Sequence, residues 1–131
     1  MLELASRHAD SAPVPIGEIA KKHNVPERFL VQILLQLKRA GLVNSTRGAA
    51  GGYRIAQVPD QISLGKIMEV MDGRTSEAIA EADHQCDTTA ARVLQQTWLN
   101  VAHLEEEMLN RDTLADLLDR MNTEESCMYY I

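Results

Sequence analysis

The stretch NSTRGAAGGYRIA, residues 44–56, constrains the fold of this chain more than any other part of the sequence. Short runs of β-forming residues lie on both sides of its glycine-rich loop, a pattern that predicts a two-stranded hairpin. Glycine adopts the backbone conformations of tight turns and lets a backbone approach another molecule closely. Arg47 lies at the tip of this turn, where it is either an ordinary solvated charge or a side chain that reaches a partner.

The segment before the hairpin contains the strongest amphipathic helix of the sequence, predicted over residues 26–41. Pro26 suits a first helical turn, and Gly41 is a natural C-terminal stop. One face of this helix is apolar, and long polar side chains lie on the opposite face. The apolar face comprises Leu30, Ile33, Leu34 and Leu37, and the polar face comprises Arg28, Gln32, Gln36 and Arg39. A shorter amphipathic helix, IGEIAKKHN, precedes it and stops at Asn24.

Three further segments follow the hairpin. SLGKIMEVMDG predicts a helix that begins after Ser63, with Met68 on its inward face. A long helix is predicted over about residues 88–110, followed by a short last helix capped by Asp112. We therefore expect a mainly α protein with a small hairpin, divided into an N-terminal domain over 1–73, a linker over 74–87 and a C-terminal helical part over 88–131.

The formal net charge of −6 is unevenly distributed along the chain. Residues 1–56 hold eight Lys/Arg and four Asp/Glu, whereas residues 57–131 hold five and fifteen. A basic half can bind a polyanion, because each neutralised phosphate releases counterions. The sequence has no apolar run long enough for a membrane span, no signal-peptide pattern and two cysteines, so we expect a reduced, cytoplasmic protein without a membrane partner.

The order of a short helix, a turn, a polar-faced helix and a hairpin predicts a winged helix-turn-helix. The second helix of such a pair lies in the major groove of DNA, where Arg can pair with guanine and Gln with adenine. The hairpin lies beside that helix, and the negative potential of a narrow minor groove attracts arginine at its tip. We therefore expect DNA contacts from Arg28, Gln32, Gln36, Lys38, Arg39 and Arg47, and from the wing glycines Gly48, Gly51 and Gly52. Taken alone, such a polar stripe is more often a solvated face, and Lys21 and Lys22 fit solvation as well as phosphate contact.

The segment from Val14 to Asp72 resembles the Rrf2 family of bacterial transcriptional regulators. The resemblance lies in IGEIA, in VPERFLVQILLQLKRAGLVNSTRGAAGGYRIA, and in Ile62, Leu64 and Ile67. The pattern of the wing is highly specific, and the spacing from Trp98 to TLADLL is similar to that of the family's dimer helix and last helix. The resemblance implies a homodimer that binds an imperfect palindrome in a promoter, most often as a repressor, with Arg28, Gln32 and Arg47 at reading positions.

Two departures from the family pattern bear on function. The chain starts part-way through the family's first helix, so either the start is misassigned or this helix is truncated. If it is truncated, we expect less core burial, phosphate contact and dimer packing from it. Cluster-bearing members place three cysteines before the dimer helix. Here Cys86 matches one of them, and Ala80, Arg92 and Gln95 occupy the other ligand positions. An iron–sulfur cluster needs several thiolate or imidazole donors, so we expect neither a cluster nor another metal.

The predicted long helix repeats apolar residues every seven positions, with further apolar side chains beside this line. An intrachain core could use them, but a helix this apolar in a small domain more often pairs with a second copy. We therefore predict a homodimer through Leu94, Trp98, Val101, Leu104 and Met108.

Three functions are compatible with these patterns. The first is a sequence-specific DNA-binding regulator whose effector is a small molecule or a partner protein. The second is a winged-helix interaction module without DNA binding. The third is a thiol- or metal-responsive regulator acting through Cys86, although an unremarkable loop cysteine is more frequent there. The sequence has no nucleophile–base pair at informative spacing and no phosphate-binding loop, so we do not expect an enzyme.

Overall fold

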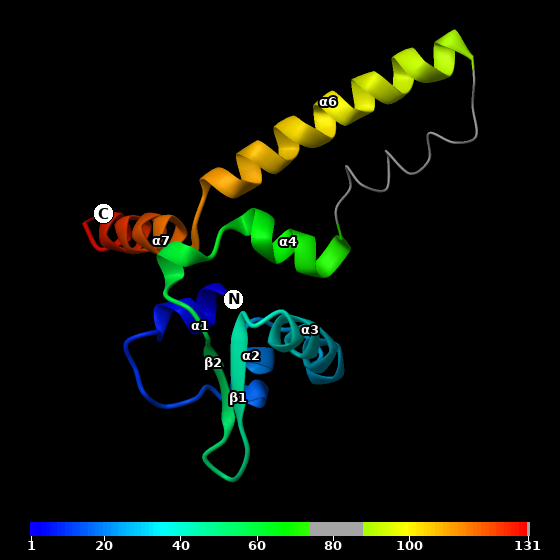
Figure 1. The fold of residues 1–131 in the computed structure, drawn as a ribbon. Coiled ribbons are helices and arrows are strands. Elements are labelled where there is room, and N and C mark those ends of the chain that lie inside the picture. Colours follow the sequence, from blue (N-terminus) through cyan, green and yellow to red (C-terminus); the bar gives the residue numbers. More distant parts are fainter. Residues whose placement is uncertain (74–87, 131) are drawn as a thin grey trace.

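A computed structural model describes residues 1–73 and 88–130, which form a mainly helical molecule with a two-stranded hairpin (Figure 1). The predicted fold class is therefore confirmed. The predicted linker over 74–87, with Cys86, lies outside the described residues. The elements are α1 (Leu2–Ser6), α2 (Ile16–Lys22), α3 (Glu27–Arg39), β1 (Val43–Thr46), β2 (Gly52–Ile55), η1 (Pro59–Gln61), α4 (Leu64–Asp72), α6 (Thr89–Arg111) and α7 (Leu114–Met128).

The apolar core lies within the N-terminal part. It is formed by side chains from α1, α2, α3, β1 and β2. Leu42 and Ile62 have no exposed surface, and Leu34 and Leu37 of α3 are nearly as deeply buried. Leu114, at the start of α7, completes this core from the C-terminal part. Since burying one such side chain contributes roughly 1.5–3 kcal/mol, this cluster holds α3 and the hairpin together.

The turn between α2 and α3 depends on one residue in the left-handed region. Asn24 has a φ of 51°, a conformation that asparagine tolerates better than most residues. Pro26 then precedes α3 with extended backbone angles. The helix runs over Glu27–Arg39, slightly shorter than predicted, because Gly41 adopts a φ of 74° and Leu42 N–H donates to the Leu37 carbonyl at 2.9 Å.

The hairpin is fastened to the chain that leads into α2. Val43 faces Ile55 across the two strands, and Ser45 faces Tyr53. Tyr53 also exchanges two backbone hydrogen bonds with Val14, at 2.9 and 2.8 Å. Tyr53 therefore packs at the base of the hairpin, and the hairpin is held beside the helix-turn-helix.

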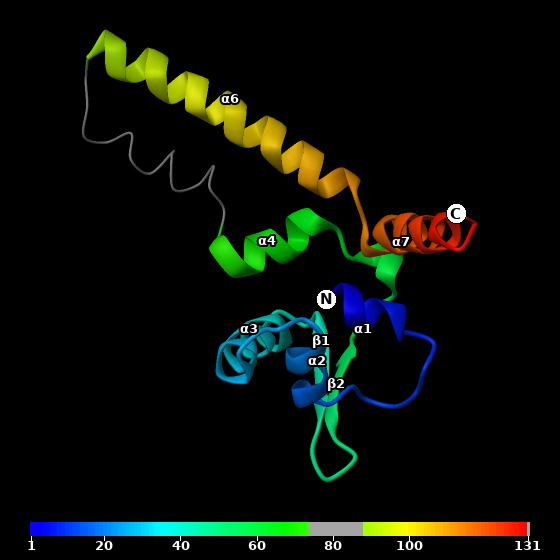
Figure 2. The same ribbon diagram turned by 180° about the vertical axis from the view of Figure 1, so that it is seen from behind.

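The C-terminal helices attach to the N-terminal part through a short bridge. Leu64 N–H donates to the Asp112 carbonyl at 2.9 Å, and Leu114 N–H donates to the Ile62 carbonyl at 2.8 Å. α4 packs on α6, and α7 packs on α1. In both views α6 and the hairpin tip lie at opposite ends of the molecule (Figures 1 and 2). None of the helices in the described ranges combines the length and apolar content needed to cross a bilayer.

Two expectations about helix details are wrong. The cap of the last helix is Thr113, whose hydroxyl accepts from Asp116 N–H at 3.2 Å while the Asp116 carboxylate accepts from Thr113 N–H at 2.9 Å. The reciprocal pair satisfies backbone groups at the helix start, and Asp112 instead forms an ion pair with Arg120 at 2.7 Å. Met68 does not point into the core but is 39% exposed, and it borders the pocket between α4 and α6.

Candidate nucleic-acid interface

The outer face of α3 is the first component of the candidate site. Leu30, Leu34 and Leu37 face the core, so the helix periodicity places the polar side chains outward. The polar stripe predicted from the sequence is exposed along its whole length, and it consists of Arg28, Gln32, Gln36 and Arg39. Arg28 and Gln32 lie in the first half of α3, the half that helix-turn-helix proteins direct at base edges.

The wing tip is the second component, and its three glycines differ in their surroundings. Gly48 has a φ of 110°, and a Cβ atom there would meet nothing within 4 Å. A Cβ at Gly51 would lie 2.4 Å from the Thr46 carbonyl oxygen, and one at Gly52 would lie 2.2 Å from the Val14 carbonyl oxygen. The turn and the Val14 bridge therefore require Gly51 and Gly52. The predicted DNA contacts of all three glycines stay predictions.

A polar contact joins the two components. Lys38 Nζ, on the last turn of α3, donates a hydrogen bond to Ser45 Oγ of β1 at 2.5 Å. An ammonium group has further donors, so this bond leaves the predicted phosphate contact of Lys38 possible. The bond links the orientation of the wing to that of α3.

Two basic residues of the N-terminal part are neutralised within the protein. The Glu3 side chain is 9% exposed and lies 2.8 Å from Lys22 Nζ and 3.0 Å from the Arg7 guanidinium. Arg7 also contacts Glu18 at 2.5 Å. The hydrogen bond from Lys22, followed by that from His23 and the nearby positive charges, lowers the pKa of the Glu3 carboxyl below its ordinary value. These contacts brace α1 against α2 and make Lys22 a poor candidate for binding phosphate.

Other arginines of residues 1–56 have no partner among the described residues and are available to bind another molecule. Within residues 1–73 and 88–130, the side chains of Arg28, Arg39 and Arg47 have neither an ion pair nor a hydrogen bond to protein. Their unmet charges lie on α3 and at the wing tip. This concentration of free positive charge is what an approaching phosphate backbone would attract.

Arg54 joins this group, although it was not among the predicted contacts. It lies on β2, opposite Asn44, and is exposed, whereas its neighbour Ile55 is buried. The alternation of inward and outward residues along a strand was the signal that could have identified it. Arg54 extends the positive surface from the wing tip along the hairpin.

The predicted dimer side chains form one exposed apolar face on α6. Trp98 is 55% exposed and Met108 is 69% exposed, with Val93 adding to the same face. The other exposed members are Leu94, Val101 and Leu104. Ala102, on the side turned to α4, is the buried residue of the helix. Within residues 1–73 and 88–130, no other element covers this face.

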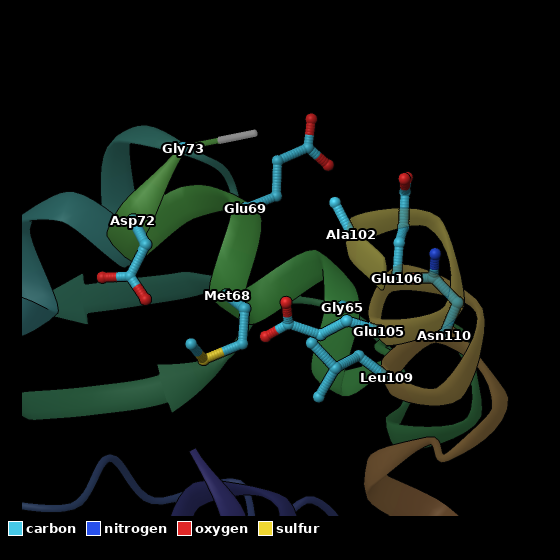
Figure 3. Close-up of a pocket in the computed structure, with 10 residues that line it drawn as sticks. All are labelled: Gly65, Met68, Glu69, Asp72, Gly73, Ala102, Glu105, Glu106, Leu109 and Asn110. Carbon is cyan, nitrogen blue, oxygen red and sulfur yellow. The ribbon is translucent and has the colours of Figure 1, made fainter. Parts of the chain in front are cut away.

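A pocket of about 100 Å³ lies between α4 and α6 (Figure 3). Met68 of α4 and Leu109 of α6 supply apolar surface, and carboxylates border it from both helices. The acidic lining residues are Glu69, Asp72, Glu105 and Glu106. This pocket therefore touches both the helix that follows the wing and the helix that carries the exposed apolar face.

The described residues do not form a metal centre. No group of three or more His, Cys, Asp or Glu side chains is placed to hold an ion within residues 1–73 and 88–130. Arg92 and Gln95 of α6 offer no thiolate or imidazole, and Cys127 lies exposed in α7. Since Cys86 lies outside the described residues, the expected lack of a cluster stays a prediction.

Comparison with protein families matches residues 1–120 to the Rrf2 family, described as "Iron-dependent Transcriptional regulator". Among characterised sequences, the HTH-type transcriptional regulator CymR of Bacillus subtilis is 36% identical over 132 aligned positions, covering 100% of this chain and 91% of CymR. The HTH-type transcriptional regulator IscR of Aliivibrio salmonicida is 28% identical over 118 positions, covering 90% of this chain and 70% of IscR.

Two solved structures of similarly named proteins share the fold. T. potens IscR superposes with a TM-score of 0.74 at 33% identity, covering 92% of this chain and 78% of that protein. CymR of B. subtilis, described as a global cysteine regulator, superposes with a TM-score of 0.73 at 32% identity, covering 91% of this chain and 87% of CymR. The likeness thus includes both the winged part and the long C-terminal helix.

Proposed function

The chain belongs to the Rrf2 family of transcriptional regulators, and from this premise we propose that it binds a palindromic operator as a homodimer. It is a DNA-binding transcriptional regulator and not an enzyme. In the proposed complex α3 lies in the major groove and the wing in the adjacent minor groove. An interaction module without DNA binding is not favoured, because the relatives are HTH-type transcriptional regulators.

The observation that carries this proposal is the free polar stripe of α3 beside a basic wing. Arg28 and Gln32 would read base edges, while Gln36, Lys38 and Arg39 would position α3 on the backbone. Arg47 would enter the minor groove, and the open surface at Gly48 would let the wing approach the backbone. Bound at a promoter in the cytoplasm, the dimer would act as a repressor.

The exposed face of α6 supports the dimer. A stripe with Trp98, Val101 and Leu104 at its centre leaves apolar side chains in water unless a second copy covers them. A homodimer places two winged parts in symmetric positions, which is what a palindrome requires. The same side chains, Leu94, Trp98, Val101, Leu104 and Met108, would then form the interface.

Two sets of hydrogen bonds, joined by residues 62–66 of the chain, connect the start of α7 with Gly41 just after α3. The Ile62–Leu114 bond fixes the start of α7 to the chain that leads into α4. Lys66 Nζ of α4 donates to Gln57 Oε1 at 2.9 Å, and Gln57 Nε2 donates to the Gly41 carbonyl, just after α3, at 3.2 Å. A small-molecule or protein effector that moves α4 or α6 would therefore change the position of α3.

Selection of bound duplexes from a random library tests the function directly. We expect enrichment of a palindrome and, at physiological salt, an affinity about a thousandfold higher than for a scrambled duplex. In a fluorescence-anisotropy titration, equal affinity for both duplexes, varying with salt alone, would overturn the proposal of a sequence-specific reader.

The variant Arg47→Ala tests the wing. We expect operator affinity to fall about tenfold, because an arginine that enters the minor groove loses both a charge contact and its readout of groove width. Arg92→Ala is the matched control, since it removes the same charge from an exposed position on α6. Equal affinities for wild type and Arg47→Ala would remove the wing from the mechanism.

A further inference from the structure

Phe29 is an exposed aromatic residue in the first turn of α3. It is the single phenylalanine of the chain and is 61% exposed, although its neighbour Leu30 is buried. It lies outside the apolar cluster that joins α3 to the rest of the N-terminal part. The core therefore does not account for a large apolar side chain at this position.

The position of Phe29 on the helix associates it with the polar stripe. Gln32 and Gln36 follow it by three and seven residues, so the three side chains form one line along the helix, with Arg28 directly before Phe29. Exposed apolar residues that occur singly are common and need no explanation. Phe29 differs because it lies among the side chains proposed to read bases, at the end of α3 that meets the major groove.

The major groove presents one apolar group, the C5-methyl of thymine. Phenylalanine is among the side chains that contact this methyl, whereas arginine and glutamine read the donors and acceptors beside it. An exposed ring next to Arg28 and Gln32 would cover such a methyl and lose water from both surfaces.

We infer that Phe29 is a specificity residue that contacts the C5-methyl of one thymine in each half-site, next to the base pair read by Gln32. This inference rests on the proposed function. Because glutamine pairs with adenine, the expected half-site contains an A·T pair at the position of Gln32 and a thymine beside it.

Replacement of thymine by uracil tests the contact, since uracil keeps the base pair and lacks the methyl. The experiment uses the full chain and the duplex enriched by selection, with uracil placed symmetrically at one thymine position of both half-sites at a time. At one of the thymine positions, we expect uracil to lower the affinity of wild type about fourfold per half-site. This factor corresponds to the free energy lost when one methyl group is removed from an apolar contact. We expect Phe29→Ala to bind more weakly and to show no loss at that same position.

Two controls separate the contact from folding and from the proposed function. Phe29→Leu keeps an apolar side chain and should retain part of the uracil effect, while an unchanged thermal midpoint for Phe29→Ala would confirm that the fold is intact. If Phe29→Ala loses as much as wild type at every uracil, or if wild type is insensitive at all thymines, the inference is overturned while DNA binding stands. If wild type enriches no sequence, the proposed function fails first and the inference fails with it.

Discussion

The winged part buries most of its apolar side chains, whereas α6 exposes most of its own. In α3 the leucines at 30, 34 and 37 are buried within the same chain, whereas α6, described over all its 23 residues, buries Ala102 and exposes a tryptophan, leucines and a methionine. The two regions also differ in charge. The winged part has exposed arginines without an ion pair in residues 1–73 and 88–130, whereas residues 57–131 carry an excess of acidic side chains. Within the described ranges the N-terminal fold is therefore complete, but two surfaces have no partner among the described residues: a basic one on α3 and the wing, and an apolar one on α6.

Trp98→Ala tests the apolar surface and has the largest expected effect on assembly. Tryptophan is enriched among interface residues whose truncation costs about 2 kcal/mol or more, so the dimer dissociation constant should rise at least about thirtyfold. Sedimentation equilibrium over a range of protein concentrations measures this constant. Operator affinity should fall with the dimer.

Leu37→Ala is the matched variant in the winged part. Leu37 is 2% exposed, so its truncation should lower the free energy of unfolding by about 3 kcal/mol and leave the dimer constant unchanged in the folded protein. A wild-type protein that sediments as a monomer at all concentrations would contradict the contrast between the two regions.

Gly52→Ala tests how far the wing depends on the chain before α2. A Cβ atom at this position would meet the Val14 carbonyl oxygen, so we expect a loss of about 1.5 kcal/mol in the free energy of unfolding. Gly48→Ala strains a left-handed backbone but meets no neighbouring atom, so its loss should be about 1 kcal/mol or less. Chemical denaturation of the two variants measures both values, and a larger loss at Gly48 would show that turn strain outweighs the bridge.

Glu3→Gln tests the brace between α1 and α2, and its expected effect is as small as that of Gly48→Ala. The pKa of Glu3 is lowered in the folded state, so its carboxylate stabilises the fold above its ordinary pKa of 4.5, and this contribution is lost as pH falls through the folded-state pKa. At neutral pH the variant should lose about 1 kcal/mol, because the hydrogen bond to a charged partner is weakened.

The same comparison at acid pH supplies the control for Glu3. Wild type and Glu3→Gln should have converging free energies of unfolding as pH falls through the lowered folded-state pKa of Glu3, because wild-type Glu3 is then protonated. A difference between them that is constant from neutral to acid pH would show that packing, and not charge, connects α1 with α2.

Much of the fold could be predicted because its signals are local. The apolar period of residues 30–37 predicted α3, and the glycine-rich loop between β-forming runs predicted the hairpin. The start of the long helix at Thr88 and the stop at Gly41 follow from capping chemistry within a few residues. The cap of α7 was misassigned because Asp112 and Thr113 are both good capping residues, although the capping box of Thr113 with Asp116, three residues later, is itself a local signal.

The candidate site was predicted in outline for the same reason, and its details were not. The helical period of α3 predicts its polar stripe, and the position of Arg47 at the tip of the turn predicts its exposure. The alternation of inward and outward residues along β2 could have predicted that Arg54 is exposed. The ion pair between Lys22 and Glu3 could not be predicted, because the two residues lie 19 positions apart and no local sequence pattern indicates that they are in contact.

By itself, then, the sequence determined which segments become helix or hairpin, which face of each is polar, and the family to which the chain belongs. These properties depend on neighbours a few residues apart. The tertiary structure alone decided which charges are neutralised, why Gly52 must be glycine, and which face of α6 is left uncovered by the other described elements. Those outcomes depend on contacts between segments far apart in the chain, such as Val14 with Tyr53 and α4 with α6, whose formation is set by how the whole core packs.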